Sequence, residues 1–166
     1  RLDKDTSGVI VVAKNDSALS HLSNQLKNRE VEKTYICLVK GNLPSLKAVI
    51  DAPIARDPYH RQRMAVVENG RDSSTKFSVL KRFDQFDYVE VKPLTGRTHQ
   101  IRVHMNSLGN PVAGDSLYNG FVPDLCRQFL HAQKISFIHP SNLKIVEFSV
   151  ELPEDLTYFL KNIDKE

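Results

Sequence analysis

The sequence predicts an α+β fold, in which flanking helices pack around a mixed, mostly antiparallel β-sheet. Apolar, β-branched runs outnumber the segments whose apolar residues recur at helical spacing, which favours a sheet as the main element. Most of these runs are joined by short polar connections, and short connections favour antiparallel neighbours. The chain has 166 residues, which is enough for one domain with a real core.

The first forty residues predict a strand, a helix and a second strand. Residues 9–13 are almost wholly apolar and follow a Ser-Gly turn, which predicts a buried strand. Residues 16–28 predict an amphipathic helix, because leucines recur at helical spacing after the N-capping side chains of residues 15–17. Residues 34–39 are apolar on both faces, as in an interior strand, which Gly41 ends.

Two strand pairs are predicted in the rest of the chain. Residues 75–80 are expected to pair with residues 86–91, and residues 130–138 with residues 144–150, each across a short polar connection. Residues 51–73 are rich in Pro, Arg, Asp and Gly and have no period. They predict a long excursion with short strands, and such excursions often carry function.

Two further helices are predicted between and after these strands. Thr98 is the expected cap of a helix that ends at Gly109. Its buried stripe is formed by Ile101, Met105 and Leu108. Pro153 opens a last short helix, because proline is well accommodated at the start of a helix.

The composition fits a globular protein and excludes several classes. The 40% hydrophobic and 26% charged residues are ordinary values for such a protein. No apolar run reaches about 18 residues, so we expect neither a membrane-spanning helix nor a secretory leader. Cys37 and Cys126 lie far apart and are expected to be buried, reduced thiols, which favours a cytoplasmic protein.

No cofactor site is predicted. No Cys-x-x-Cys or His-Glu-x-x-His spacing supports a metal, and His99 and His104 are too far apart in register to share a helical face. The seven glycines are scattered and form neither a phosphate-binding loop nor a dinucleotide fingerprint. We therefore expect no metal and no nucleotide cofactor.

The net charge is only +3, but the cations are concentrated in the middle third of the chain. A local positive surface attracts phosphate, but the charge pattern alone does not outweigh the simpler explanation, a solvated set of surface charges. These cations are Arg56, Arg61, Arg63, Lys76, Lys81, Arg82, Lys92, Arg97 and Arg102.

An acidic segment at the start of the chain and a distant arginine carry most of the chemical interest. Asp3 and Asp5 lie on a turn-prone stretch, where acids usually cap turns. Arg102 lies near the N-terminus of the predicted helix, where a nearby carboxylate makes a cation easier to accommodate. A bidentate Asp–Arg pair would hold the acid ionised and aimed, as a catalyst requires. A glycoside hydrolase that uses Asp3 and Asp5 is the second hypothesis, and it needs a carboxylate on each side of a sugar cleft.

Tyr35 lies in the predicted interior strand and has two interpretations. A tyrosine in such a strand is most often a core or rim residue whose hydroxyl finds a partner. The alternative is a stacking platform for a nucleobase, since every base offers a π face. The strand pattern is compatible with both.

Together these segments resemble the RluA-type pseudouridine synthases. Residues 1–8, Arg-Leu-Asp-Lys-Asp-Thr-Ser-Gly, are similar to the family's signature. Lys33-Thr34-Tyr35 resembles its tyrosine motif, and residues 93–104 resemble its arginine motif. Further matches in the same order are Arg56-Asp57-Pro58 with Arg61 and Met64-Ala65-Val66, Gly114-Asp115-Ser116-Leu117-Tyr118 and Leu130-His131-Ala132. The resemblance covers nearly the whole chain.

The resemblance implies a role for particular residues. Asp3, rather than Asp5, is the implied catalytic aspartate, and attack on the sugar, attack on the base and removal of a sugar proton all stay open as its role. Tyr35 would stack on the target uracil and help proton movement, and Arg102 would pair with Asp3. The implied RNA- or substrate-binding residues are Arg1, which fills space in the RNA stack, Arg97, His99 and Ile101, which packs near the base.

The implied activity is isomerisation of specific uridines in RNA. The base is detached at nitrogen and reattached through carbon, which needs no metal, nucleotide or flavin. The implied substrate is bacterial large-subunit ribosomal RNA, with transfer RNA second. Residues 1–166 would form a single catalytic domain, a fragment without the family's leading strands or its S4 domain. The rival hypothesis is an RNA-binding module that keeps the pocket but performs no chemistry.

Overall fold

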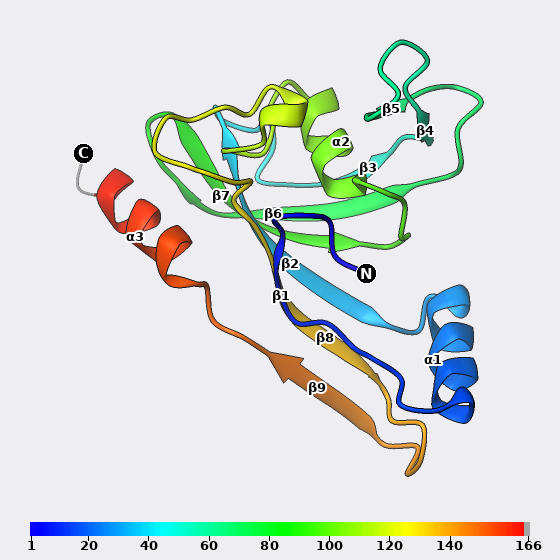
Figure 1. Cartoon of the computed structure of the whole chain (residues 1–166). Helices are drawn as coiled ribbons and strands as arrows, with labels where there is room; N and C mark the ends of the chain where they lie inside the picture. Colours follow the sequence, from blue (N-terminus) through cyan, green and yellow to red (C-terminus); the bar gives the residue numbers. More distant parts are fainter. Residues whose placement is uncertain (165–166) are drawn as a thin grey trace.

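A mixed sheet dominates the computed structural model, which describes residues 1–164 (Figure 1). The strands of the main sheet are β1 (Ser7–Gly8), β2 (Glu32–Lys40), β3 (Lys47–Asp51), β6 (Ser74–Arg82), β7 (Phe86–Pro93), β8 (Leu130–Ile138) and β9 (Ile145–Ser149). A small second sheet consists of β4 (Ile54–Arg56) and β5 (Met64–Val66). The helices are α1 (Asp16–Asn28), α2 (Gln100–Ser107), the 3-10 turn η1 (Ser116–Tyr118) and α3 (Glu154–Ile163).

The strand order confirms the predicted α+β fold. The main sheet runs β1-β8-β2-β7-β6-β3, and β9 pairs with the end of β8. Among the described strands, β1 and β8 pair in parallel and the other strand pairs are antiparallel. Both predicted strand pairs form, and the excursion of residues 51–73 contains the short strands β4 and β5. In the described residues no helix is long and apolar enough to cross a membrane.

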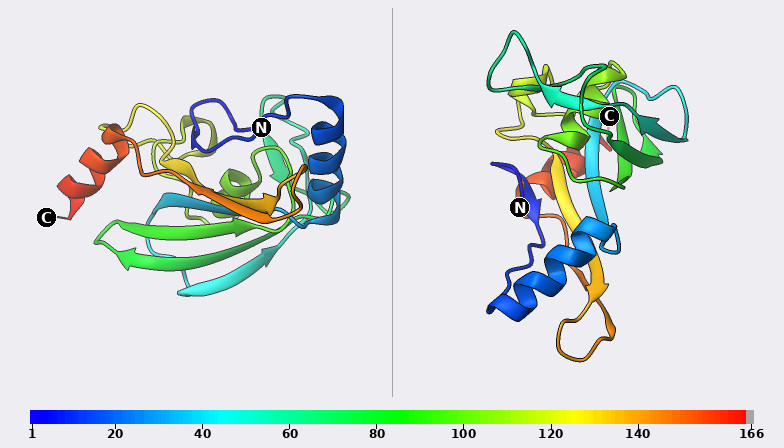
Figure 2. Two further views of the ribbon diagram at one scale, coloured as in Figure 1. Left: turned by 90° about the horizontal axis from the view of Figure 1, so that it is seen from below. Right: turned by 90° about the vertical axis from the view of Figure 1, so that its right-hand side faces the viewer.

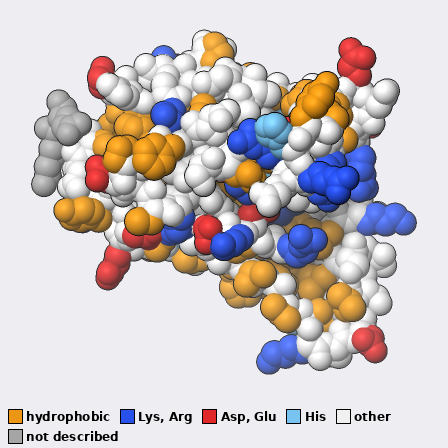
Figure 3. All heavy atoms as spheres, turned by 45° about the horizontal axis from the view of Figure 1, so that its top comes forward, with side chains coloured by type: hydrophobic (Ala, Val, Ile, Leu, Met, Phe, Trp, Pro, Cys, Tyr) orange, Lys and Arg blue, Asp and Glu red, His pale blue; other side chains and the backbone are white. Residues whose placement is uncertain are grey.

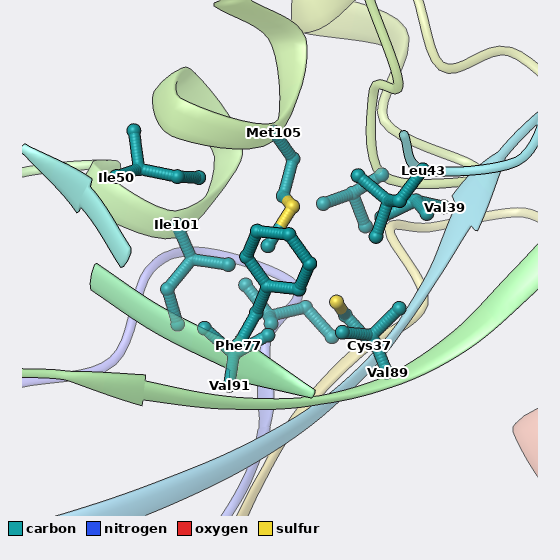
Figure 4. Close-up of a cluster of buried hydrophobic side chains, with 11 residues drawn as sticks. Cys37, Val39, Leu43, Ile50, Phe77, Val89, Val91, Ile101 and Met105 are labelled. Carbon is teal, nitrogen blue, oxygen red and sulfur yellow. The ribbon is translucent and has the colours of Figure 1, made fainter. Parts of the chain in front are cut away.

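The core lies on both faces of the sheet, because β2 is buried on both. Cys37 and Val39 belong to a cluster that includes side chains of α2, whereas Ile36 and Leu38 belong to a cluster with α3. This alternation follows from the two-residue period of a strand. Figure 4 shows Met105 of α2 above the strands of the first cluster. Burial of such a side chain contributes about 1.5–3 kcal/mol, so α2 is fixed firmly to the sheet.

The predicted buried strand over residues 9–13 is wrong. The strand β1 ends at Gly8, and the side chains of Ile10 and Val12 are 56% and 76% exposed. The reason lies elsewhere in the chain: from Lys134 onward, β9 occupies the edge of β8 that residues 9–13 would need. The helix over residues 16–28 has the predicted bounds, with Asn15 as its N-cap.

Three other details differ from the prediction. Helix α2 begins at Gln100 and not directly after Thr98, because His99 occupies the N-cap position in the left-handed conformation, with φ of 56°. Leu108, which was expected in the buried stripe, is 37% exposed because the helix ends before it and Leu108 is the C-cap. Of the two free cysteines, Cys37 is buried as expected but Cys126 is exposed, since it lies in the bend before β8.

Candidate active site

Asp3 begins a tight turn. The N–H of Thr6 donates to the carbonyl oxygen of Asp3 (3.1 Å), and Asp5 between them has a φ of 67°. Asp tolerates this left-handed conformation better than most residues. Gly8 then pairs with Ala132 at a φ of 123°, and an added Cβ would lie 2.3 Å from the Ala132 carbonyl oxygen. Only glycine fits there, so the Ser-Gly step places the Asp3 turn against β8.

Two side chains from the segment before β8 bind the backbone of this turn. The amide of Gln128, which is buried, donates to the carbonyl oxygen of Lys4 (2.6 Å). The guanidinium of Arg127 donates to the carbonyl oxygen of Asp5 (3.0 Å). Because both contacts are made to the backbone, they leave the carboxylate of Asp3 available for other partners.

A β-bulge positions Tyr35 beside this turn. Thr34 pairs with Lys134 but Tyr35 pairs with Ala132, so Gln133 is the extra residue of the bulge. Bulges change the direction of neighbouring side chains and are common next to active sites. Burial, and then the charge of Asp3, raise the pKa of Tyr35, so its phenol stays protonated at neutral pH.

The buried amide of Gln100 shapes the loop before α2. Its Oε1 atom accepts the hydroxyl of Thr95 (2.7 Å) and the N–H of Arg97 (2.9 Å). Its Nε2 atom donates to the carbonyl oxygen of Ser74 (2.9 Å). A loop fixed through a buried side chain in this way holds Arg97 and His99 in defined positions.

Arg102 is bound mainly by Asp115. Its Nε and Nη2 atoms lie 2.6 and 2.9 Å from the two carboxylate oxygens of Asp115, while its Nη1 atom lies 3.4 Å from Oδ2 of Asp3. The predicted bidentate pair is therefore made with Asp115, and the contact with Asp3 is longer and single. Burial opposes the charge of Arg102, but the bonds to Asp115 and the charge of Asp3 outweigh it and raise the pKa of the guanidinium.

Tyr118, three residues beyond Asp115, connects His99 to this cluster. Its buried hydroxyl accepts the backbone N–H of Met64 (2.8 Å) and lies 2.8 Å from Nδ1 of His99. The guanidinium of Arg102 lies 5.0 Å from the centre of its ring, a cation–π contact. Burial, followed by the charge of Arg102, lowers the pKa of His99, so this imidazole is neutral at pH 7.

These elements surround one cavity of about 470 Å³. The structure brings six of the predicted site residues to its wall: Arg1, Asp3, Tyr35, Arg97, His99 and Ile101. Arg102 is not on the wall but lies behind Asp3, with its side chain 7% exposed. Figure 3 shows Lys and Arg side chains gathered around a hollow on one face of the molecule.

The charges on the cavity wall are unequal. Among the described residues Asp3 is the only carboxylate on the wall, whereas the cations there are Arg1, Lys33, Arg97 and Lys134. Asp5 is exposed and not on the wall, so the second carboxylate that a glycoside hydrolase would need is missing from this cavity. The wall suits a polyanion that carries a flat, partly apolar group.

A protein-family model described as RNA pseudouridylate synthase matches residues 1–107, which include the Asp3 turn, Tyr35 and Arg102. The chain belongs to the RNA pseudouridylate synthase family. It is 46% identical over 99% of its length to an uncharacterized RNA pseudouridine synthase, YlyB, of Bacillus subtilis, and covers 55% of that protein. It is 44% identical over 98% of its length to ribosomal large subunit pseudouridine synthase D of Nitrosomonas europaea, and covers 50% of it. The chain thus spans about half the length of these curated relatives.

Solved structures of the pseudouridylate synthase family share this fold. The human RNA pseudouridylate synthase domain containing 1 protein superposes with a TM-score of 0.79 at 32% identity, over 92% of this chain and 67% of that one. The human domain containing 4 protein gives a TM-score of 0.82 over 99% of this chain and 74% of that one. Its 23% identity supports the fold alone.

Sequence reasoning missed three residues of this candidate site. Asp115 and Tyr118 lie in a segment that was matched to the family but given no role. The one available signal was that a buried Arg102 needs a carboxylate partner, and Asp3 had already been assigned as that partner. Lys33 is on the wall, where burial lowers its pKa, and only its position two residues before Tyr35 pointed to it. Within residues 1–164 no cluster of His, Cys, Asp or Glu side chains could hold a metal ion.

Proposed function

We propose that this chain is the catalytic part of an RNA pseudouridine synthase, an isomerase that converts specific uridines in RNA to pseudouridine. The observation that carries the proposal is the position of Asp3 on the cavity wall, with Nη1 of Arg102 3.4 Å from its Oδ2 atom. Membership of the family supports the same activity. Asp3 is the catalytic residue in this proposal.

The reaction requires one well-placed carboxylate. The bond between ribose C1′ and N1 of uracil breaks, and a bond between C1′ and C5 forms. C5 loses its proton and N1 gains one, so no electrons or groups enter from outside. A carboxylate next to the base and sugar can assist each of these steps, and the buried guanidinium of Arg102, 3.4 Å away, fixes the direction of the Asp3 side chain.

The target uridine must leave its stack to reach Asp3, at a cost of a few kcal/mol. Tyr35 offsets part of this cost, since stacking of a base on an aromatic ring contributes about 1–3 kcal/mol. The phenol of Tyr35 is protonated, so it can also donate to the base during proton movement. Ile101, which is buried and on the wall, offers an apolar surface beside the ring.

The cations of the wall would hold the RNA backbone around the flipped nucleotide. Arg97 also donates from Nε to the carbonyl oxygen of Asp72 (3.0 Å), which leaves its terminal nitrogens for phosphate. Arg1 lies at the same opening and would fill the space left in the RNA stack. His99 is the remaining RNA contact in this proposal.

Large-subunit ribosomal RNA is the substrate we propose, with transfer RNA second. The relative from Nitrosomonas europaea carries ribosomal large subunit specificity in its name and is 44% identical. A ribosomal substrate fits a cytoplasmic protein, as do two cysteines that are both free.

Release of tritium from RNA labelled at C5 of uridine tests the proposal, because isomerisation frees this label and binding does not. We expect the protein to release label from an unmodified transcript of large-subunit ribosomal RNA. Asp3→Asn should abolish release, because it removes the carboxylate and leaves the turn intact. An inactive RNA-binding module would bind the transcript without releasing label.

Asp5→Asn is the matched control, because Asp5 lies two residues away on the same turn and its side chain is exposed. Asparagine tolerates the left-handed conformation of that position, so this variant should release label at the rate of the original protein. Retained release in Asp3→Asn would reject Asp3 as the catalytic residue.

A further inference from the structure

Two buried histidines show how this protein fixes the proton on an imidazole. Nδ1 of His104 lies 2.8 Å from the hydroxyl of Thr75, and its Nε2 lies 2.9 Å from the carbonyl oxygen of Ala52. A carbonyl only accepts hydrogen bonds, so Nε2 of His104 carries the proton and Nδ1 accepts from the hydroxyl. His131 has the same arrangement, with a serine hydroxyl at Nδ1 (2.9 Å) and a backbone carbonyl at Nε2 (3.1 Å).

His99 has a hydroxyl partner at Nδ1, as His104 and His131 do, but within residues 1–164 no carbonyl binds its Nε2 atom. The oxygen of Tyr118 already accepts the N–H of Met64, and its other partner within residues 1–164 is Nδ1 of His99. If Nδ1 were the donor, the buried proton of Tyr118 would have no acceptor, which costs about 1–3 kcal/mol. The hydroxyl of Tyr118 therefore donates to Nδ1, and the proton of the neutral ring is on Nε2.

The Nε2 atom of His99 is left free to bind something else. It has no hydrogen-bond partner among the described residues. Every buried side-chain nitrogen or oxygen atom of these residues has a partner, so Nε2 is not buried and is accessible. His99 is on the cavity wall, and its left-handed backbone (φ 56°) holds it at the first turn of α2. Non-glycine residues held in this conformation occur more often at functional sites than elsewhere.

We propose that His99 offers a neutral Nε2–H donor to a carbonyl oxygen of the flipped uracil, and that Tyr118 is the positioning residue that sets this tautomer. The identity of the ligand rests on the proposed function, whereas the assignment of the tautomer does not. A neutral donor is suited to a neutral oxygen; a phosphate would be bound better by the cations of the same wall. Uracil offers two carbonyl oxygens, and cytosine has an amino group in place of one of them.

Long-range proton–nitrogen correlation spectra of the imidazole rings test the tautomer directly. We expect His99 and His104 both to show the neutral form with the proton on Nε2, so that His104 serves as an internal reference. Tyr118→Phe should give His99 a mixture of both tautomers and leave His104 unchanged. A proton on Nδ1 of His99, or an unchanged His99 in Tyr118→Phe, would overturn the role of Tyr118.

The ligand is tested by the kinetics of His99→Asn on the unmodified large-subunit transcript. Asparagine tolerates the left-handed backbone but is too short to replace Nε2. We expect the KM to rise about three- to tenfold through loss of one hydrogen bond, with kcat changed less. The slope of log KM against log salt concentration should stay the same, because a neutral donor displaces no counterion.

Arg97→Gln is the reference for a charged contact and should reduce that slope by about 0.7–0.9. A similar reduction in His99→Asn would show a cationic phosphate contact and overturn the inference, as would an unchanged KM. If the unaltered protein releases no tritium, the proposed function fails, while the spectra still decide the tautomer.

Discussion

Two buried carboxylates of this molecule are both bound by an arginine, but only one of these arginines also contacts a residue of the cavity wall. Asp115 is 1% exposed and binds Arg102 through both oxygens, at 2.6 and 2.9 Å. Asp87 is 0% exposed and accepts the N–H of Leu43 at 2.8 Å, with Arg82 more distant at 3.5 Å. Burial therefore does not distinguish the functional carboxylate from the structural one.

The difference lies in the remaining donors of each arginine. Arg82 is 44% exposed and donates from Nη2 to the carbonyl oxygen of Leu43, so its cluster ties a loop to the β6–β7 hairpin. Arg102 is 7% exposed and directs Nη1 to Asp3 on the cavity wall. A buried ion pair whose arginine has a donor left for a residue of a cavity wall is a better indicator of function than a buried ion pair alone.

Arg102→Met should have the largest effect on both stability and activity. It leaves Asp115 buried without its cation, which costs about 3–5 kcal/mol, and it removes the partner of Asp3. Urea unfolding measures the first loss and tritium release the second. An unfolding free energy within about 1 kcal/mol of the original would show that Asp115 does not depend on Arg102.

The double variant Arg102→Met with Asp115→Leu separates these two losses. Replacement of a buried ion pair by apolar residues of similar volume is often neutral or stabilising by about 1–4 kcal/mol. We expect urea unfolding to show most of the stability restored while tritium release stays absent. Recovery of tritium release would mean that the Arg102–Asp115 pair serves the fold rather than the site.

Asp87→Asn should lower stability but not activity. The amide keeps part of the hydrogen bonding but loses the charge, and unsatisfied groups of this kind cost about 1–3 kcal/mol. Tritium release per folded molecule should match that of the original protein. A selective loss of kcat in a folded Asp87→Asn protein would remove the distinction between the two carboxylates.

Tyr35 extends the comparison from the charged cluster to the cavity itself. If stacking is its main contribution, Tyr35→Phe should retain most of the tritium release and Tyr35→Ala should lose about one to three kcal/mol of stabilisation of the flipped base. Measurement of kcat and KM for both variants checks this order. Equal losses in the two variants would assign the contribution to the hydroxyl.

A smaller effect is expected from pH. Burial lowers the pKa of His104 in the folded protein, so the unfolded chain takes up protons first as the pH falls. Stability should therefore be complete above about pH 6.5 and should fall below it. Urea unfolding at neutral and mildly acid pH measures the drop, and His104→Gln should reduce it. An equal drop in that variant would assign the pH dependence to other groups.

Local sequence patterns predicted the helices and strands, but they could not predict features that depend on contacts between distant residues. The bounds of α1 follow from leucine spacing after its N-cap, and β8 has the bounds of the strand predicted over residues 130–138. Residues 9–13 form an almost wholly apolar run, but β9 takes the edge of β8, and no local pattern contains that competition. Asp115 escaped notice for a similar reason, because its partner lies thirteen residues earlier on another element.

The most direct test of the central claim is the identity of the product. An unmodified transcript of large-subunit ribosomal RNA would be incubated with the protein, digested to nucleosides and separated by chromatography with mass detection. Our account predicts that part of the uridine becomes an isomer of the same mass with the retention of pseudouridine, and that Asp3→Asn forms none. The same amount of isomer from Asp3→Asn, or none from the unaltered protein on this or any transfer RNA transcript, would contradict it.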